Sequence, residues 1–254
     1  MHPYLLSVSV LCVAPVLSAQ GAVCTTLPQV EEHLLAAARN LEPELHLRVD
    51  PALQPALQKY LFCITSQFCF KFRMRPMPDG EIILTPQYAD DWRIIQSLTR
   101  PQAGIRLTER EEKTLAEARR RVAALVKPGM SRSAVVKALH DDLVSRMTYK
   151  PSRWMGGASA ALLENEGVCE AYARALGLML HLADIPSRKV FGMLDKRTTH
   201  EWNLVFINGR RLHVDATLSD TRPASGPFLL LPDSALSRTH SWCPSLLPAA
   251  EKEL

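Results

Sequence analysis

The most informative stretch of the chain reads GVCEAYA, at residues 167–173. Behind it, Leu176, Met179 and Leu180 recur at helical spacing until a break at residues 183–186, which predicts a buried helix with Cys169 in its first turn. Unpaired backbone N–H groups and the helix dipole favour a thiolate there, and the same N–H groups could receive an oxyanion. A small buried core residue is the alternative interpretation of Cys169 alone.

A histidine and an aspartate follow the cysteine, in the motifs HEWN (residues 200–203) and VDAT (residues 214–217). Between them, Asn208-Gly209 predicts a two-residue hairpin turn that joins strands at residues 202–207 and 210–217. The parts of an acyl-transfer triad therefore follow one another along the chain, each at the edge of a predicted element.

The hairpin register indicates that His200 and Asp215 lie on one face of the predicted sheet. With two turn residues, His200 opposes Thr217 and Asp215 opposes Trp202, so the pair are diagonal neighbours, roughly 7–8 Å apart between α-carbons. Asp215 could then fix the tautomer of the imidazole through a hydrogen bond. A three-residue loop would instead put the two side chains on opposite faces. His213 lies on the same face as His200 and is a weaker candidate for the base.

The three motifs together resemble the transglutaminase-like superfamily, the papain-like thiol fold shared by transglutaminases and many bacterial thiol hydrolases. Upstream, KALHD (residues 137–141) and Thr148-Tyr149 resemble the helix and the segment that precede the nucleophile in bacterial members. The resemblance covers about residues 108–245. It implies an α+β fold with a papain-like transglutaminase core, in which a helical half with the nucleophile-bearing helix packs on an antiparallel sheet, plus a small α+β N-terminal region.

The resemblance also implies roles for the three residues: Cys169 as the nucleophile, His200 as general base and acid, and Asp215 as the group that orients His200. The chain departs from the family pattern at Glu201, where members often carry a small residue, and at Ala216, where proline is frequent. Neither departure removes a catalytic atom. No second oxyanion donor is evident in the sequence. Trp154 is a candidate, although a tryptophan at this position more often packs in the core or at the rim.

We expect three parts along the chain: a signal peptide at residues 1–19, an N-terminal α+β region at 20–105, and a transglutaminase-like catalytic domain at 106–254. The apolar run from Leu5 to Leu17 is too short to span a bilayer, and Leu17-Ser18-Ala19 offers small residues for cleavage. This predicts an exported, periplasmic or extracellular protein without stable membrane insertion after cleavage.

Local patterns predict several elements. In the N-terminal region we expect a capped helix from Thr26, a second short helix through Leu61, and two strands around a turn. The first helix is predicted from the apolar stripe Val30, Leu34, Leu35 and Ala38 and from the capping residues 26–29, and the second begins after Asp50-Pro51. The two strands are predicted at residues 70–74 and 81–85, with the turn at 78–80. Further on, Thr108 and Glu111 form a capping box for a helix to about Val126, and Ser131 or Ser133 caps the next helix.

Composition excludes few classes of function. The 254 residues are 47% hydrophobic and 22% charged, as in an ordinary globular protein, and the net charge of +4 is mild. The basic run at residues 119–121 lacks aromatic interleaving, so we interpret it as a solvated helix face and predict no nucleic-acid partner. The sequence contains no calcium-loop pattern and no metal-ligand spacing of His and Cys, so we predict no cofactor and no metal.

The cysteine count fits an exported enzyme with one reactive thiol. Signal cleavage removes Cys12 and leaves five cysteines, an odd number. If Cys169 is the reactive thiol, the other four could form up to two disulfides, and Cys63 with Cys69 could close a small loop. Four mostly buried thiols are the alternative. The four remaining residues are Cys24, Cys63, Cys69 and Cys243.

From these features we expect a Cys-His-Asp acyl-transfer enzyme that acts on peptide or protein amides through a thioester. The choice between hydrolysis and transamidation stays open, although exported relatives favour a cysteine protease or amidase over cross-linking. The rival interpretation is a non-catalytic peptide- or cell-wall-binding module that retains the fold. A purely structural exported domain is a third, and it predicts that Cys169→Ala leaves every phenotype unchanged.

Overall fold

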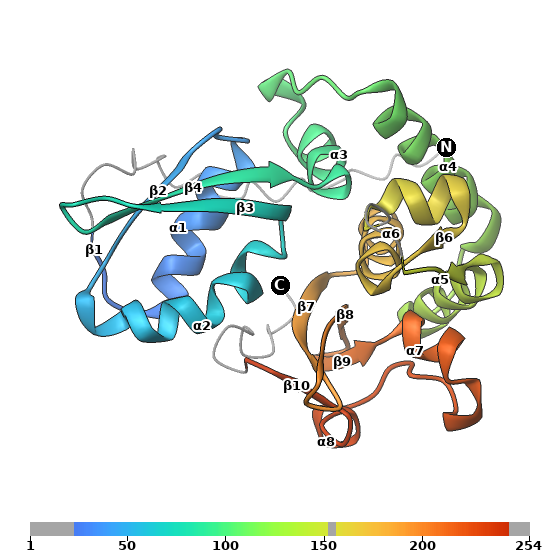
Figure 1. Cartoon of the computed structure of the whole chain (residues 1–254). Helices are drawn as coiled ribbons and strands as arrows, with labels where there is room; N and C mark the ends of the chain where they lie inside the picture. Colours follow the sequence, from blue (N-terminus) through green and yellow to red (C-terminus); the bar gives the residue numbers. More distant parts are fainter. Residues whose placement is uncertain (1–22, 152–155, 244–254) are drawn as a thin grey trace.

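The computed structural model describes residues 23–151 and 156–243. Two four-stranded sheets, each packed against helices, form the body of the molecule (Figure 1). The α+β fold class expected from the sequence is confirmed. The predicted signal peptide at residues 1–19 and the candidate oxyanion donor Trp154 lie outside the described residues.

The N-terminal sheet has the strand order β1-β2-β4-β3 and carries two helices. Its elements are β1 (Val23–Cys24), α1 (Leu27–Arg39), β2 (Leu45–Val49), the 3-10 turn η1 (Pro51–Leu53), α2 (Gln54–Thr65), β3 (Cys69–Pro76) and β4 (Glu81–Tyr88). Apolar side chains from both helices, among them Leu34 and Ile64, are fully buried against Leu45 and Leu84 of the sheet. This burial holds the region together as a core of its own.

Several N-terminal predictions are confirmed. The Thr26 hydroxyl accepts a hydrogen bond from the Gln29 N–H at 3.4 Å, and the Gln29 side chain accepts one from the Thr26 N–H at 3.2 Å, so the capping box forms. Strands β3 and β4 pair in antiparallel fashion around the turn predicted at residues 78–80. Strand β2 was not among the predicted elements, although its apolar residues Leu45, Leu47 and Val49 alternate with polar ones and are buried.

The rest of the chain packs helices on a second, antiparallel sheet with the order β10-β7-β8-β9. Its helices are α3 (Asp90–Thr99), η2 (Pro101–Ala103), α4 (Glu109–Leu125), α5 (Arg132–Arg146), the π-helical η3 (Ala160–Glu164), α6 (Cys169–Leu182), α7 (Ala216–Thr221), η4 (Pro223–Ser225) and α8 (Asp233–Leu236). The strands of this sheet are β7 (Ser187–Leu194), β8 (Thr198–Ile207), β9 (Arg210–Val214) and β10 (His240–Trp242). The short strands β5 (Thr148–Tyr149) and β6 (Glu166–Gly167) form a separate parallel pair.

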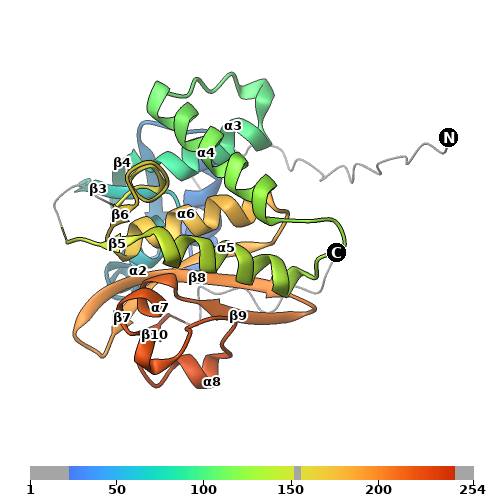
Figure 2. The ribbon, with the colours of Figure 1, turned by 90° about the vertical axis from the view of Figure 1, so that its right-hand side faces the viewer.

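Helix α6 lies at the centre of this second part. Figure 2 shows α4, α5 and α6 on one side of the sheet and α8 on the other. Leu176, Met179 and Leu180 of α6 are fully buried, as their helical spacing predicts. The predicted capping residues Thr108, Glu111 and Ser131 begin α4 and α5. Among the described residues, no helix combines the length and apolarity that crossing a membrane requires.

Helix α3 packs against both parts of the molecule. Trp92 contacts the core of the N-terminal sheet, whereas Ile94 is fully buried in the core around α6. The two cores therefore meet at α3, which precedes the expected boundary near residue 105.

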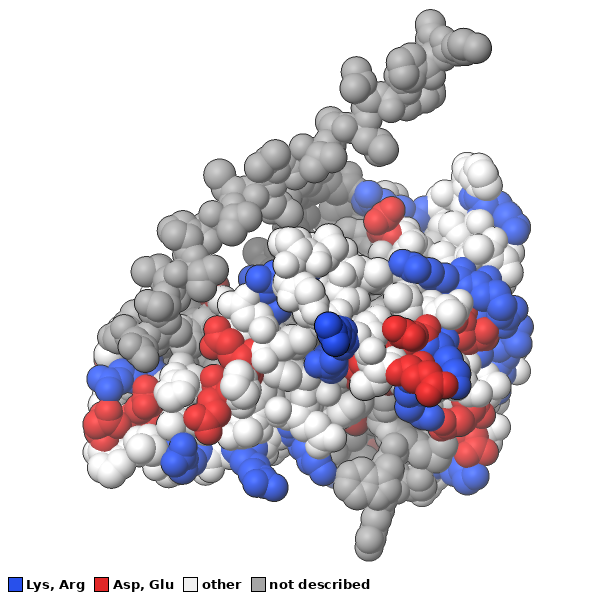
Figure 3. Space-filling model, turned by 90° about the horizontal axis from the view of Figure 1, so that it is seen from above, with Lys and Arg blue, Asp and Glu red and all other residues white. Residues whose placement is uncertain are grey.

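The interpretation of residues 119–121 as a solvated face is wrong for one of the three. Arg121 is 3% exposed and donates hydrogen bonds to the Leu162 carbonyl and the Asn165 side chain, both at 2.9 Å. Successive helical residues point about 100° apart, and the third residue of this run points inward. On the surface seen from above, basic and acidic side chains are interleaved (Figure 3).

Candidate active site

Cys169 is the first residue of α6, as predicted, and its side chain is half-buried. Strand β6 leads into it and pairs with β5, where Tyr149 lies opposite Gly167. Within the described part of the chain, no side chain caps the helix. The N–H groups of Cys169 and Glu170 therefore stay available at the start of α6, as an oxyanion site requires, whereas the Ala171 N–H donates to the Val168 carbonyl at 2.9 Å.

His200 comes from β8, and the predicted hairpin turn positions it. Asn208 and Gly209 both adopt positive φ, 51° and 67°, the conformation that a two-residue turn of this type demands. Ile207 pairs with Arg210, so the predicted register is confirmed. His200 itself lies beyond the part of β8 that pairs with β9, because that pairing ends at Asn203 and Val214.

The prediction that Asp215 lies in a strand is wrong. Strand β9 ends at Val214, and Asp215 is the N-cap of α7, whose Leu218 N–H donates to Asp215 Oδ1 at 3.0 Å. Thr217 therefore lies in a helix, not opposite His200. The predicted hydrogen bond between His200 and Asp215 still forms, since His200 Nε2 lies 2.7 Å from Asp215 Oδ2.

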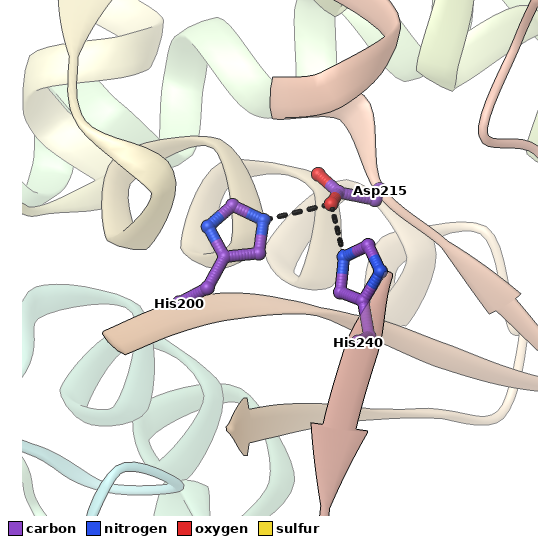
Figure 4. A group of neighbouring side chains, drawn as sticks. All are labelled: His200, Asp215 and His240. Atoms are coloured by element: carbon purple, nitrogen blue, oxygen red, sulfur yellow. Dashed lines mark hydrogen bonds and ion pairs between the residues drawn. The ribbon is translucent and has the colours of Figure 1, made fainter. Parts of the chain in front are cut away.

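A second histidine shares the same carboxylate oxygen. His240 Nε2 lies 3.0 Å from Asp215 Oδ2, and its Nδ1 lies 2.8 Å from the Thr239 hydroxyl (Figure 4). His200, Asp215 and His240 are 4%, 1% and 3% exposed, so the group is closed to bulk water. Sequence reasoning missed His240, because the three-residue strand β10 is too short for a periodicity and no motif surrounds it.

Burial and hydrogen bonding oppose each other at this cluster. Burial alone would raise the pKa of Asp215, but the hydrogen bonds from His200 and His240 outweigh it and lower the pKa to about 2. Burial likewise opposes the charged form of His200, yet hydrogen bonds to Asp215 and to the Cys169 thiol raise its pKa to about 10. With Nε2 held by Asp215, the ring nitrogen left for the thiol is Nδ1.

Further contacts fix the helix that carries Asp215. The Ser219 hydroxyl donates to the Asp215 carbonyl at 3.0 Å, and His140 Nε2 of α5 lies 2.8 Å from that hydroxyl. The Tyr172 hydroxyl of α6 donates to Asp220 at 2.5 Å. Helix α7 is thereby tied both to α5 and to the helix that begins with Cys169.

His213, the weaker candidate for the base, has other partners. Trp202 Nε1 donates to His213 Nδ1 at 2.9 Å, and His213 Nε2 lies 3.0 Å from Asp233. Burial lowers the pKa of His213 to about 4, which outweighs the effect of Asp233 and keeps the ring neutral. Both ring nitrogens are thus engaged, and the structure brings His200 rather than His213 to the thiol.

A buried cluster of charged residues ties α6 to α3 and β7. Arg174 is fully buried and donates to Asp91 at 2.9 Å and to Glu170 at 2.9 Å, while Lys189 of β7 donates to Asp91 at 2.7 Å. Glu201, next to His200, faces the same cluster, and its Oε2 has no hydrogen-bond partner among the described residues. Burial raises the pKa of Glu201 to about 7, although Arg174 and Lys189 act against that rise.

Among the described residues, the group that could hold a metal ion is the cluster of His200, Asp215 and His240. His200, Asp215 and His240 each offer one ligand atom, and these atoms lie within 4.8 Å of one another. Two imidazoles and a carboxylate suit divalent transition metals. Hydrogen bonds of 2.7 and 3.0 Å among these atoms already account for their closeness.

Residues 119–216 match the sequence model of the core of the transglutaminase-like superfamily. This segment contains Cys169, His200 and Asp215, so the part of the chain that carries the site belongs to that superfamily. The superfamily includes transglutaminases and cysteine-protease-like enzymes. No curated protein matches the chain in sequence.

Solved structures resemble the chain at low identity. A transglutaminase crystal structure is 11% identical with a TM-score of 0.40, over 68% of this chain and 50% of that one. The periplasmic domain of TgpA from Pseudomonas aeruginosa, bound to ethylmercury, is 18% identical with a TM-score of 0.34, over 60% of this chain and 64% of that one. A candidate cysteine protease from Cytophaga hutchinsonii is 17% identical with a TM-score of 0.36, over 67% and 70%. The chain thus spans half the length of the transglutaminase.

Proposed function

We propose that the protein is an exported thiol acyl-transfer enzyme that acts on peptide or protein amides, with Cys169, His200 and Asp215 as its catalytic triad. One observation carries the proposal: His200 Nε2 lies 2.7 Å from Asp215 Oδ2, and the same imidazole interacts with the side chain of Cys169 at the start of α6. Membership of the transglutaminase-like superfamily supports the same chemistry.

The geometry suggests how the steps would run. Asp215 holds one proton of His200 on Nε2, and because the pKa of His200 is raised to about 10, the ring also holds on Nδ1 the proton that the Cys169 thiol has given up. The thiolate attacks the amide carbonyl carbon, and the resulting oxyanion is received by the first N–H groups of α6. The imidazolium then donates its Nδ1 proton to the leaving amine, which leaves a thioester on Cys169. Water or a second amine attacks the thioester and frees the enzyme.

In this proposal His240 is a positioning residue. Its Nε2–H donates to the same Asp215 oxygen that binds His200, and the Leu218 N–H donates to the other oxygen. Three donors leave the carboxylate little freedom to rotate. A fixed carboxylate in turn fixes the plane of the His200 ring, which needs a defined direction towards the sulfur.

The choice between hydrolysis and transamidation depends on which acceptor reaches the thioester. An experiment separates the two: the purified chain is incubated with a casein substrate, with and without the fluorescent amine dansylcadaverine. New amino termini indicate hydrolysis, whereas fluorescence bound to casein indicates transamidation. We expect hydrolysis, abolished in Cys169→Ala at unchanged circular dichroism. Turnover that survives in Cys169→Ala would refute the proposal.

A further inference from the structure

Two thiols from distant parts of the chain line one small cavity. Cys63 lies on α2 of the N-terminal region, and Cys243 directly follows β10, the strand that carries His240. Together with Gln67 and Phe191 they line a cavity of about 10 Å³, roughly the space of a single water molecule. The two side chains therefore border the same narrow space.

Phe191 of β7 lines the cavity together with both thiols. The Cys63 sulfur lies 3.7 Å from the Phe191 carbonyl oxygen, to which it donates. Strand β10 pairs with β7 as far as Trp242 opposite Gly192, and a continuation of that register by one position would set Cys243 opposite Phe191, which lines the same cavity. Opposed residues of antiparallel strands have α-carbons about 4.5–5.5 Å apart. The Cys63 sulfur contacts Phe191, and Cys243 lines the same cavity as these two residues.

The other cysteines have different surroundings. Cys69 is 3% exposed and its sulfur donates to the Thr65 carbonyl at 3.4 Å. It does not form the disulfide with Cys63 that would close a small loop. Cys24 lies on β1, and neither it nor Cys69 lines the cavity. Cys169 stands at the candidate active site. All five described cysteines are in the thiol form.

We propose that Cys63 and Cys243 are a redox pair that forms a disulfide by exchange with a small-molecule disulfide such as oxidised glutathione. One protein thiolate attacks the small disulfide, which forms a mixed disulfide and releases one thiol. The second protein thiolate attacks the mixed disulfide, forms the Cys63–Cys243 bond and releases the second thiol. The protein loses two electrons and two protons, and the reagent gains them as two thiols.

The surroundings of Cys63 indicate how such a bond behaves. Burial, with a smaller contribution from the neighbouring Cys243, raises the pKa of Cys63 to about 11. A thiol of high pKa is mostly protonated at neutral pH, so exchange is slow there and faster at mildly alkaline pH. The same thiol is a poor leaving group, so the bond resists reduction once it has formed.

The bond would fasten the strand that carries His240. Strand β10 has only three residues and pairs with β7 alone at the edge of the sheet. A link from Cys243 to α2 would hold the end of β10 against the N-terminal region, three residues after His240. Because the link closes a loop that contains most of the chain, the expected stabilisation is at the upper end of the usual range.

The test uses the full mature chain and does not depend on the proposed enzymatic function. The reduced protein is incubated with oxidised glutathione at pH 8.5, blocked with a maleimide, digested without reduction and analysed by mass spectrometry. We expect a linked peptide that contains Cys63 and Cys243, together with a rise in Tm of roughly 5 °C or more that dithiothreitol reverses.

Matched variants make the result decisive. Cys63→Ser and Cys243→Ser should each lose the linked peptide and the rise in Tm, whereas Cys24→Ser should keep both. If a serine variant fails to fold, the alanine variant at the same position replaces it. A different linkage, a glutathione adduct alone, or an unchanged Tm after complete oxidation of the pair would each overturn the proposal.

Discussion

His200 Nε2 lies 2.7 Å from Asp215 Oδ2, and this single hydrogen bond joins the end of a strand to the cap of a short helix. An aspartate in that place performs two tasks at once. Its Oδ1 caps α7 through the Leu218 N–H, and its Oδ2 orients the imidazole. Substitutions at Asp215 can therefore affect the local fold and the reaction separately.

Asp215→Asn should lower kcat by on the order of 10²- to 10⁴-fold, because an amide can present its NH₂ group to His200 and favour the wrong tautomer. The variant keeps an oxygen for the Leu218 N–H, so the expected loss of Tm is small. Steady-state kinetics and thermal unfolding of the same samples check both parts. Full activity in Asp215→Asn would show that our assignment of its role is wrong.

His240→Ala should reduce kcat by roughly tenfold with little change in KM, since Asp215 loses one of its donors but the substrate contacts remain. His240→Gln is the matched variant, because its side-chain N–H can reach towards the same oxygen. We expect Gln to restore most of the rate. A rate in His240→Gln as low as that in His240→Ala would argue against positioning through this hydrogen bond.

Asp91→Asn should destabilise the fold by about 3–5 kcal/mol, because it removes the ion-pair partner of the buried Lys189 and leaves the buried Arg174 paired with Glu170 alone. Urea denaturation measures the loss. The control is Asp79→Asn, which breaks an exposed ion pair with Arg48 and should cost no more than about 1 kcal/mol. Equal losses in the two variants would contradict the structural role given to the buried cluster.

Glu201 should make the protein less stable as the pH rises towards neutral. Its pKa is about 7 in the folded protein against an ordinary value of 4.5, so the folded state binds the proton more tightly. Stability therefore falls between about pH 4.5 and pH 7. Glu201→Gln should be more stable than the parent by about 1–3 kcal/mol at pH 8 and should show little advantage at pH 4.

The control for this pH dependence is Glu109→Gln, an exposed carboxylate paired with Lys113 on α4. Its difference from the parent should stay within about 0.5 kcal/mol at both pH values. A stability advantage of Glu201→Gln that is the same at pH 4 and pH 8 would mean that titration of Glu201 is not its cause.

Sequence patterns predict the parts of the site with strong local signals. Cys169 lies two residues after Gly167 and opens a long apolar helix, and Asn208-Gly209 fixes the register of β8 and β9. The start of α7 directly after Asp215 was not predicted, because Val214 to Thr217 continues the alternation of a strand. An aspartate followed by helix-forming residues is also an N-cap signal, and that signal decided the structure.

Features that depend on distant partners could not be predicted. His240 lies 25 residues after Asp215 on a three-residue edge strand, and only the tertiary fold brings the two together. Arg121 is buried because Leu162 and Asn165 fold back over α4. The periodicity of a single sequence does not show such tertiary contacts. Arg121 was therefore predicted to face solvent, although it is 3% exposed.

The most direct test of the central claim is the rate at which iodoacetamide alkylates each cysteine of the folded chain at neutral pH, followed by mass spectrometry. Burial raises the pKa of Cys63 to about 11 and that of Cys69 to about 12, so both should react slowly. We predict that Cys169 reacts selectively, at least tenfold faster than in the unfolded chain, and that His200→Ala removes this advantage. Alkylation of Cys169 that is no faster than in the unfolded chain, or that His200→Ala leaves unchanged, would contradict an activated thiol.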